Sequence, residues 1–256
     1  MKTKSLGFIG GGRITRIFLQ AFTNKKHEFD SVLVFDTNTE VLHALKQQFP
    51  FIQTGDLQQA ASQPTVFIAL HPPMIMETLD KIADMVSSDT LVISLAPKIN
   101  IEKIASRLKT QNILRLIPNA TSYINEGYNP VTFATGINPA EKSELLDLLK
   151  LLGTTFEVPE AKLEAYALLS AMLPTYFWFQ WKELVSLGQP MGLSEDETKA
   201  AVRQTLQDAL DLYFDHGLSP EQVTDLIPVK PIGEHEAQIA EIYQSKLMGL
   251  FEKIKP

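Results

Sequence analysis

The stretch LGFIGGGRITRIFL, residues 6–19, decides the fold of the N-terminal half. Residues 6–9 form a short apolar run typical of a buried strand, and residues 13–19 place apolar side chains at helical spacing. Three glycines, Gly10, Gly11 and Gly12, stand between them. Glycine allows a tight turn and a close approach of the backbone to another group. The pattern predicts a strand, a turn and a helix whose first N–H groups can bind an anion.

The same alternation of apolar runs and helical patterns continues to residue 158. Seven runs are strand-like, at residues 5–10, 31–36, 65–70, 89–96, 112–117, 130–136 and 154–159. Continuous apolar strands are typical of a parallel sheet with both faces covered, and the intervening helical patterns supply the cover. We therefore predict an α/β domain with a doubly wound parallel sheet over residues 1–158.

Residues 159–256 contain helical patterns only. A capping box, Ser194-x-x-Glu197, begins one predicted helix. The long apolar helix that precedes Ser194 in the sequence contains Pro174, which is expected to kink it. Four aromatic residues cluster in that long helix: Phe177, Trp178, Phe179 and Trp181. A helix that is apolar on most faces must be buried, either in a dimer interface or against the first domain. We favour a homodimer, because obligate interfaces resemble a divided core.

Composition excludes several classes of function. The chain has 256 residues, 45% of them hydrophobic, a formal net charge of −7 and no cysteine. Disulfides and thiolate metal sites are therefore absent, and scattered basic residues argue against a nucleic-acid partner. No apolar run reaches the ~20 residues of a membrane span, and no His, Asp and Glu set has metal-ligand spacing. We predict a cytoplasmic protein without a metal.

The glycines match a dinucleotide-binding motif. The pattern is Gly10-x-Gly12-x-x-Thr15, with threonine where glycine or alanine is usual, and it joins a strand to a helix. Asp36 ends the second strand, where a carboxylate can accept the hydroxyls of an adenosine ribose. It could instead extend the cap of the next helix. We predict NAD or NADP as the cofactor, with Asp36 favouring NAD.

Five segments together resemble the pyrroline-5-carboxylate reductase family: GFIGGGRIT (7–15), FIALHPPMIMETL (67–79), LVISLAPKIN (91–100), ILRLIPNATSYINEG (113–127) and SAMLPTYFWF (170–179). The resemblance implies a Rossmann domain followed by a helical dimerisation domain, residues 159–256. It also implies a cofactor site in three parts. The pyrophosphate would lie at Gly10, Gly12, Arg13 and Ile14, the nicotinamide ribose at Ala69, His71 and Pro72, and the nicotinamide ring at Ala96, Pro118 and Asn119.

The substrate half departs from the family pattern. KPIGEH, residues 230–235, stands where the family has SPGGTT, and residues 170–174 are bulkier than its SGSSP segment. His235 could protonate the product of hydride transfer, or it could be a solvated histidine near a helix N-terminus. Glu234 and His71 are the other catalytic candidates. Tyr176 could donate a proton, although packing in an aromatic stripe is the simpler interpretation.

Two functions remain open from the sequence. The first is an NAD(P)-dependent oxidoreductase that transfers a hydride between nicotinamide and a small C=N or C=O substrate. The second is a catalytically silent dimer that binds NAD(P) as a sensor or scaffold. Retained chemistry predicts that His235, Glu234 or His71 lies near the nicotinamide.

Overall fold

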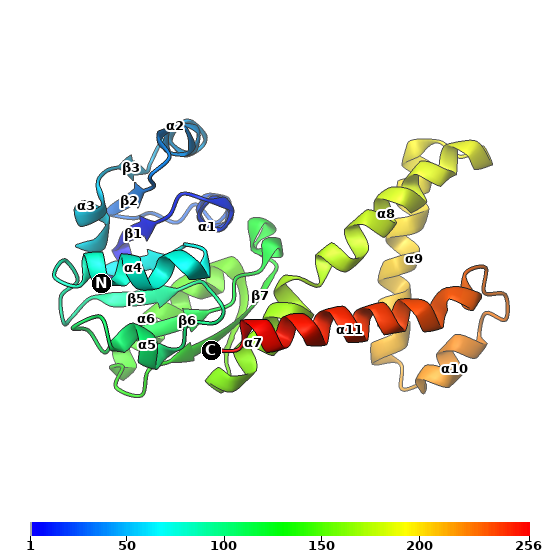
Figure 1. Ribbon diagram of the computed structural model, residues 1–256. Helices are drawn as coiled ribbons and strands as arrows, with labels where there is room; N and C mark the ends of the chain where they lie inside the picture. The colour runs from blue at the N-terminus through cyan, green and yellow to red at the C-terminus, as the bar shows by residue number, and fades with distance from the viewer. Residues whose placement is uncertain (1) are drawn as a thin grey trace. The chain divides into compact units, whose positions relative to one another are not determined.

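The computed structural model describes residues 2–256 and divides them by packing into two compact units. The first unit comprises Met1–Ala171 together with Phe251–Pro256, and the second comprises Met172–Leu250. Figure 1 shows the first unit as a sheet wrapped by helices and the second as helices only. Residues 159–171 and the chain end therefore pack with the sheet. The functional division at residue 158 stays a prediction.

The first unit is built on one eight-stranded sheet in the order β3-β2-β1-β4-β5-β6-β7-β8. The strands are β1 (Ser5–Ile9), β2 (Ser31–Phe35), β3 (Gln53–Thr54), β4 (Thr65–Ile68), β5 (Leu91–Ser94), β6 (Ile113–Leu116), β7 (Gly127–Phe133) and β8 (Gly153–Glu157). The first six pair in parallel, and their order is that of a doubly wound nucleotide-binding sheet. The predicted fold class is confirmed.

The last two strands reverse direction. β7 pairs antiparallel with β6, and β8 pairs parallel with β7. Only a short segment, Ala120–Ile124, separates β6 from β7 as a 3₁₀ helix. A parallel connection needs a crossover of about a dozen residues or more, so this short link returns the chain in the opposite direction. An all-parallel sheet was expected, and the mixed end of the sheet corrects it.

Helices cover both faces of the sheet. Their bounds are α1 (Arg13–Asn24), α2 (Thr39–Gln48), α3 (Leu57–Ala61), α4 (Pro72–Ile82), α5 (Ile101–Ala105) and α6 (Pro139–Leu149). Side chains of α1, α2 and α6 form one apolar cluster with the sheet, and those of α3, α4 and α5 form the other. Neighbouring residues of β1 divide between the layers, with Phe8 in the first cluster and Ile9 in the second. This alternation places the strand ends between two packed layers.

Local capping signals account for several helix starts. The sequence predicts caps at Asn138, which is followed by Pro139, and at Asn100. Both are confirmed: Asn138 caps α6 with Pro139 in its first turn, and Asn100 caps α5. The capping box at Ser194 and Glu197 is also present. At α2, however, the cap is Asn38, whose side chain accepts from the N–H groups of Glu40 and Val41. The sequence Thr37-x-x-Glu40 predicts a capping box that starts one residue earlier. That prediction was wrong, because Asp36 already turns the chain there by accepting the N–H of Asn38.

The region after β8 begins with short helical turns rather than one long helix. Glu160–Lys162 is a 3₁₀ helix, α7 is Leu163–Tyr166, and Ala167–Ala171 forms one π-helical turn. α8 then starts with Pro174 in its first turn. Proline cannot donate a backbone hydrogen bond, so it is tolerated at a helix start and not inside a helix. Pro174 therefore begins a helix instead of kinking one.

The second unit contains α8 (Pro174–Gly188), α9 (Glu195–Asp215), α10 (Pro220–Asp225) and most of α11 (Glu236–Ile254). α8 and α9 approach closely at Gly188, where a Cβ would lie 1.9 Å from the hydroxyl of Thr198. Within 172–250 these two residues are the buried ones in the single chain. The single-chain unit therefore has helices but no apolar core of its own.

Candidate functional site

The glycine turn lies at the carboxyl end of β1. Gly10 adopts a left-handed backbone with φ of +106° and donates its N–H to the carbonyl of Phe35, at 2.8 Å. A Cβ at Gly10 would lie 2.4 Å from the carbonyl oxygen of Ala69, which follows β4. The turn is therefore pressed between the ends of the two neighbouring strands. Only glycine meets both the conformational and the spatial demand.

Thr15 is the unusual third member of the glycine motif. Its side chain is fully buried, and its hydroxyl donates a 2.6 Å hydrogen bond to the carbonyl oxygen of Gly10. A buried hydroxyl needs such a partner. Threonine thus replaces a small packing residue and ties the first turn of α1 back to the glycine turn.

Asp36 also supports the turn. One carboxylate oxygen accepts the N–H of Gly11 at 2.7 Å, and the other accepts the N–H of Asn38 at 2.8 Å. A carboxylate has about four acceptor positions, so these two bonds leave acceptor capacity for hydroxyl groups of a ligand. The structure accommodates both interpretations of Asp36, because it shapes the turn and the start of α2 while facing the glycines.

A cavity of about 470 Å³ opens beside the turn. It is formed by the start of α1 and by the chain that follows β4 and β5. Its lining residues are Gly12, Arg13, Ile14, Ala69, Leu70, His71, Pro72, Leu95, Ala96 and Pro97. Most of the residues predicted to bind the cofactor are thus brought to one cavity. Ligands of open α/β sheets bind at this edge, beyond the carboxyl ends of the strands.

The local backbone fits a dinucleotide pyrophosphate. Gly12 precedes α1, and a Cβ placed on it would meet no protein atom within 4 Å. Gly12 lines two cavities, the one just described and a second of about 280 Å³ between α1 and α2. Its missing side chain leaves the backbone open to both. The first N–H groups of α1 have no intrahelical partner, since hydrogen bonding within the helix starts at Arg16 N–H to Gly12 carbonyl. Arg13, which lines both cavities, adds positive charge.

Three lining residues, Leu70, Leu95 and Pro97, were not predicted. Each is adjacent in the chain to a predicted residue, so the signal was their position just after β4 or β5. Asn119 was predicted and is differently engaged. Its amide donates to the carbonyl and hydroxyl of Ser170, at 3.3 and 3.2 Å, and its carbonyl oxygen accepts from Thr121. These bonds link the chain that follows β6 to Ser170, and the predicted contact of Asn119 with the cofactor stays a prediction.

The catalytic candidates fall in both units. His71 caps the start of α4 without a side-chain hydrogen bond to the helix, and it lines the 470 Å³ cavity. His235 and Glu234 belong to the second unit, in the 3₁₀ helix Gly233–His235. The His235 Nε2 atom lies 3.6 Å from a Glu234 carboxylate oxygen, and both side chains are mostly exposed. They form a local pair that solvent and small molecules can reach.

Tyr176 packs as expected for an aromatic stripe. Its ring centroid lies 6.1 Å from that of Tyr243 within the second unit. Burial, and then the neighbouring Tyr243, raise the pKa of the Tyr176 hydroxyl above its usual value. A raised pKa keeps the phenol protonated at neutral pH. The ring contact supports the packing interpretation.

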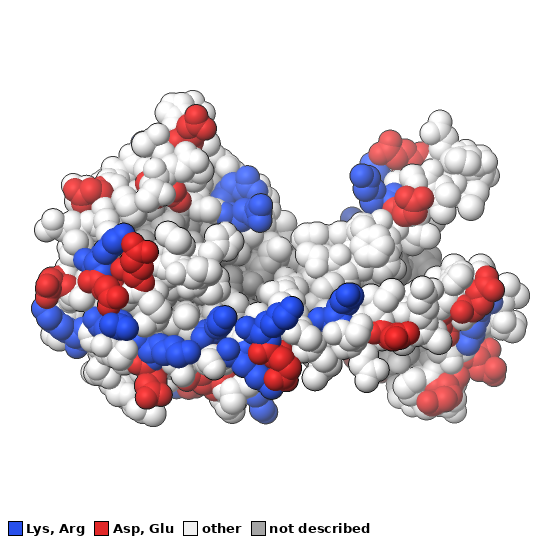
Figure 2. All heavy atoms as spheres, viewed as in Figure 1, with Lys and Arg blue, Asp and Glu red and all other residues white. Residues whose placement is uncertain are grey.

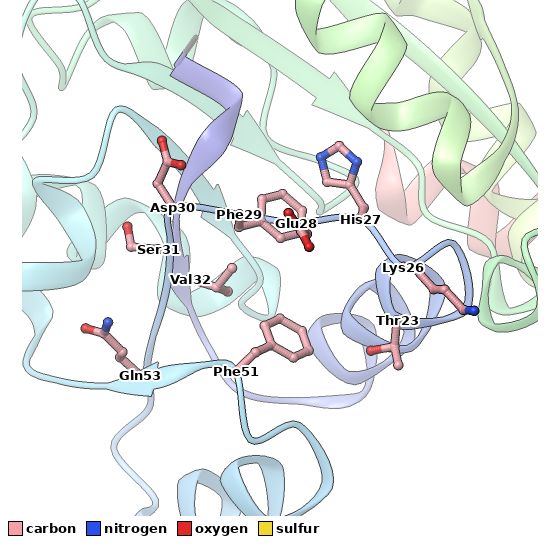
Figure 3. Close-up of a pocket in the computed structure, with 10 residues that line it drawn as sticks. All are labelled: Thr23, Lys26, His27, Glu28, Phe29, Asp30, Ser31, Val32, Phe51 and Gln53. Atoms are coloured by element: carbon pink, nitrogen blue, oxygen red, sulfur yellow. The ribbon is translucent and has the colours of Figure 1, made fainter.

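Another cavity, of about 460 Å³, lies at the opposite end of β2 (Figure 3). Figure 3 shows the rings of Phe29 and Phe51 turned toward it, with Asp30 at the start of the strand. His27 borders it, and its pKa is lowered, first by burial and then by the charge of Lys4. This cavity is at the amino edge of the sheet, where none of the predicted site residues lies. The carboxyl-edge cavity remains the stronger candidate.

Two general properties of residues 2–256 bear on the class of site. They contain no group of three or more His, Asp or Glu side chains placed to hold a metal ion. None of the helices within this range combines the length and apolar character needed to cross a bilayer.

Comparison with known proteins identifies the relatives of this chain. Residues 5–98 match the family model described as NADP oxidoreductase, coenzyme F420-dependent. The pyrroline-5-carboxylate reductase of Corynebacterium melassecola is 23% identical over 252 residues, covering 96% of this chain and 93% of that protein. Similar coverage is found for several bacterial reductases of the same name. The chain is therefore similar to pyrroline-5-carboxylate reductases over nearly its whole length.

Solved structures agree on the fold. The Plasmodium falciparum pyrroline carboxylate reductase with NADP bound superposes with a TM-score of 0.76 at 19% identity, covering 99% of this chain and 96% of that one. The pyrroline-5-carboxylate reductase of Coxiella burnetii gives a TM-score of 0.70 at 24% identity, covering 98% of this chain and 94% of that one. The predicted resemblance is confirmed, and of the two predicted functions it favours the NAD(P)-dependent oxidoreductase. The silent binding module is not favoured.

Substituting alanine at Gly12 and at Gly10 should have different effects on stability and on dinucleotide binding. Gly12→Ala should leave the free energy of unfolding within about 0.5 kcal/mol of wild type, because its extended backbone and surroundings accept a methyl group. The methyl should nevertheless weaken NADH or NADPH binding by about tenfold or more by blocking backbone approach. Gly10→Ala should cost about 2 kcal/mol or more, since the new Cβ meets Ala69 in a left-handed backbone. Urea unfolding and titration calorimetry measure both effects. Wild-type affinity in Gly12→Ala would show that no dinucleotide crosses this turn.

Proposed function

We propose that this protein transfers a hydride from a nicotinamide dinucleotide to a small C=N or C=O substrate, with cyclic imines as the first class to test. The observation that carries the proposal is the 470 Å³ cavity, in which the glycine turn and the ends of β4 and β5 meet. A nicotinamide cofactor supplies the hydride when bound, and the protein supplies orientation and a proton. The similarity to pyrroline-5-carboxylate reductases over nearly the whole chain supports the imine class.

The identity of the imine is a separate proposal. Pyrroline-5-carboxylate is one candidate, and its reduction would serve proline biosynthesis. Against it stand KPIGEH at residues 230–235 and the bulkier residues 170–174, where the family pattern has glycines and hydroxyls. A related cyclic imine or a 2-oxo acid fits these residues equally well.

We assign the proton-transfer role to His235, assisted by Glu234, and a cofactor-contacting role to His71. Imidazole titrates near neutral pH and can donate a proton to the nitrogen or oxygen, which takes the electron pair of the C=N or C=O π bond as the hydride bonds to carbon. The His235 Nε2 atom lies 3.6 Å from a Glu234 carboxylate oxygen, which places the two side chains together. The position of His71 in the cavity wall supports contact with the bound cofactor. The remaining proposed cofactor contacts are Gly10, Gly12, Arg13, Ile14, Asp36, Ala69, Pro72, Ala96 and Asn119.

Turnover tests the reaction class. With NADH or NADPH, we expect loss of the reduced nicotinamide absorbance on addition of a five-membered cyclic imine, with pyrroline-5-carboxylate, a six-membered imine and 2-oxo acids as parallel substrates. His235→Asn should lower kcat by about 100-fold, the usual contribution of a positioned acid. His43→Asn, an exposed histidine on α2, is the matched control. Tight dinucleotide binding with no turnover of any of these substrates would favour the silent module instead.

We propose NAD over NADP as the cofactor. The supporting observation is Asp36, which faces the glycine turn with acceptor capacity left after its bonds to Gly11 and Asn38. A carboxylate there accepts ribose hydroxyls and repels a 2′-phosphate. The Plasmodium falciparum relative has NADP bound, so the two proteins would differ in this choice.

Replacing Asp36 tests the cofactor preference. Asp36→Ser should weaken NADH binding by about tenfold, the cost of losing charge-assisted hydrogen bonds, and improve NADPH binding. Asp30→Ser is the control, since Asp30 precedes the same strand at its opposite end. Titration calorimetry gives all the dissociation constants. A wild-type protein that prefers NADPH, or an Asp36→Ser variant with an unchanged preference, would contradict the proposal.

We also propose a homodimer formed through the helices of residues 159–256. The second unit exposes large apolar side chains on each of its long helices, with Phe179 on α8, Phe214 on α9 and Met248 on α11 at 67%, 71% and 54% exposure. Figure 2 shows broad uncharged areas on the visible face of these helices. Apolar surfaces of this extent mark interaction sites, and obligate homodimers bury surfaces of this kind. In this proposal residues 159–256 form the dimer and residues 1–158 bind the cofactor. A cytoplasmic location is a separate part of the proposal.

Oligomeric state is directly measurable. Sedimentation equilibrium should give twice the mass of one chain at micromolar concentration. Phe214→Glu should lower the dimer content strongly, because it buries a charge in an apolar interface. Phe51→Glu is the control, since Phe51 is also exposed but belongs to the first unit. A monomeric wild-type protein would contradict the proposal.

A further inference from the structure

Three charged side chains meet in the interior of the first unit. Arg115 on β6 is fully buried, and its guanidinium contacts Glu160 at 3.0 Å and Glu164 at 2.6 Å. The Glu164 side chain is 2% exposed and that of Glu160 is 32% exposed. The charges of Arg115 and Glu164 are thus held away from solvent, and Glu160 reaches them from a partly exposed position.

The two carboxylates also hold the backbone between β5 and α5. The Glu164 oxygen that binds Arg115 accepts the N–H of Lys98 at 3.2 Å. The Glu160 oxygen that binds Arg115 accepts the N–H of Ile101 at 2.8 Å. The same pair of carboxylates therefore ties this connection to β6 at two points, three residues apart.

Lys98 has an unusual backbone conformation. Its φ is +77°, in the left-handed region that disfavours residues with a Cβ. Such a conformation costs of order 1 kcal/mol and persists only where surrounding contacts enforce it. The bond from Lys98 N–H to Glu164 is one such contact. Glu164, in turn, is oriented by Arg115.

The held segment continues directly from the wall of the cofactor cavity. Leu95, Ala96 and Pro97 line the 470 Å³ cavity, and Lys98 follows them. Pro97 has a fixed φ, so the direction of the chain at Lys98 constrains the placement of the three wall residues. Movement at Lys98 would therefore move the side of the cavity that lies across from Gly12.

Stability alone gives a weak reason for this arrangement. Burying ion pairs carries a desolvation cost, and apolar side chains of similar volume often serve as well. The ε nitrogen of Arg115 has no hydrogen-bond partner in the structure, which adds to that cost. What apolar replacements would not supply is acceptors for two backbone N–H groups at defined positions.

We propose that Arg115, Glu160 and Glu164 are positioning residues, which fix the Leu95–Ala96–Pro97 wall against the nicotinamide end of the bound dinucleotide. None of the three lines the cavity; they act through Lys98 and Ile101. This proposal rests on the proposed dinucleotide site. It predicts that disturbing Glu164 weakens recognition of the nicotinamide end while leaving recognition of the adenosine and phosphate end intact.

Two ligands measure recognition of the two ends of the dinucleotide separately. NADH, or NADPH if the wild type prefers it, contains the nicotinamide. The matching ADP-ribose, or its 2′-phosphate, contains only the adenosine and phosphate end with a free ribose. Glu164→Leu removes the acceptor for Lys98 while Glu160 still pairs with Arg115. It should raise the Kd for the dinucleotide by about tenfold and leave the Kd for the ADP-ribose compound within about twofold. Titration calorimetry measures each.

Two companion variants test the route through Lys98. Glu164→Gln keeps an oxygen that accepts from both Lys98 and Arg115, so it should bind nearly as wild type. Lys98→Gly relieves the left-handed strain, because glycine adopts positive φ freely. Added to Glu164→Leu, it should recover most of the lost dinucleotide affinity. Failure of Lys98→Gly to recover any affinity would overturn the role assigned to the Lys98 conformation.

A control removes a comparable glutamate elsewhere in the first unit. Glu144 accepts the N–H and the hydroxyl of Thr3 at 3.1 and 2.6 Å, and it lines no part of the cofactor cavity. Glu144→Leu should lower the free energy of unfolding without changing the ratio of the two dissociation constants. A ratio that stays at the wild-type value in Glu164→Leu, with dinucleotide bound by the wild type, would overturn the positioning role and leave the proposed function standing. If the wild type binds neither NADH nor NADPH, the proposed function fails and this inference fails with it.

Glu160→Leu provides the measurement should Glu164→Leu not fold. Glu160 is less buried than Glu164, and its loss leaves the Arg115–Glu164 pair in place. It frees Ile101 N–H, so the same selective loss of dinucleotide affinity is expected, with a smaller change. An unchanged ratio in Glu160→Leu would count against the proposal in that case.

Discussion

The carbonyl of Ala69 and the N–H of Gly10 set the constraint on which the site depends. Ala69 leaves no room for a Cβ at Gly10, and the bond from Gly10 to Phe35 fixes the turn against β2. With the turn held between two strand ends, α1 must begin at Arg13 and direct its N-terminus toward the cavity. Thr15 and Asp36 then secure the turn from either side. An anion-binding backbone is thus formed before any side chain takes part in recognition.

The opposite wall of the cavity is held by a different kind of interaction. There the chain after β5 passes through a left-handed lysine, and buried carboxylates oriented by Arg115 supply the acceptors that keep it in place. Glycine solves the steric problem at one wall by omitting a side chain. At the other wall, charge and hydrogen bonding hold a residue that pays a conformational cost. The two walls should therefore respond differently to mutation. At the glycine turn a new side chain would collide with its neighbours, whereas at Lys98 the loss of an acceptor would change the direction of the backbone.

The second unit raises a problem of folding rather than of chemistry. Two of its helices, α9 and α10, begin with capping boxes, yet in a single chain only Gly188 and Thr198 are buried among residues 172–250. Helices owe most of their stability in proteins to the packing of an apolar face. A partner surface, as in the proposed homodimer, would supply that packing.

Much of the first unit was readable from the sequence because its signals are local. Strand runs, Asn and Ser caps and the glycine turn depend on neighbours in the chain, whereas the assignment of Gly12, Arg13 and Ala69 to one site came from the family resemblance. The direction of β7, the end of the expected long helix at Pro174, and the engagement of Asn119 depend on contacts distant in sequence, and these escaped prediction. The Arg115 network is the clearest case. Arg115 lies 45 and 49 residues from its two carboxylates, with nothing periodic to connect them. The sequence by itself determined which residues can turn, cap and bind, since those are properties of short segments. Only the tertiary structure decided which of them meet, because a charge such as that of Arg115 can be buried only beside opposite charges, which here come from distant parts of the sequence.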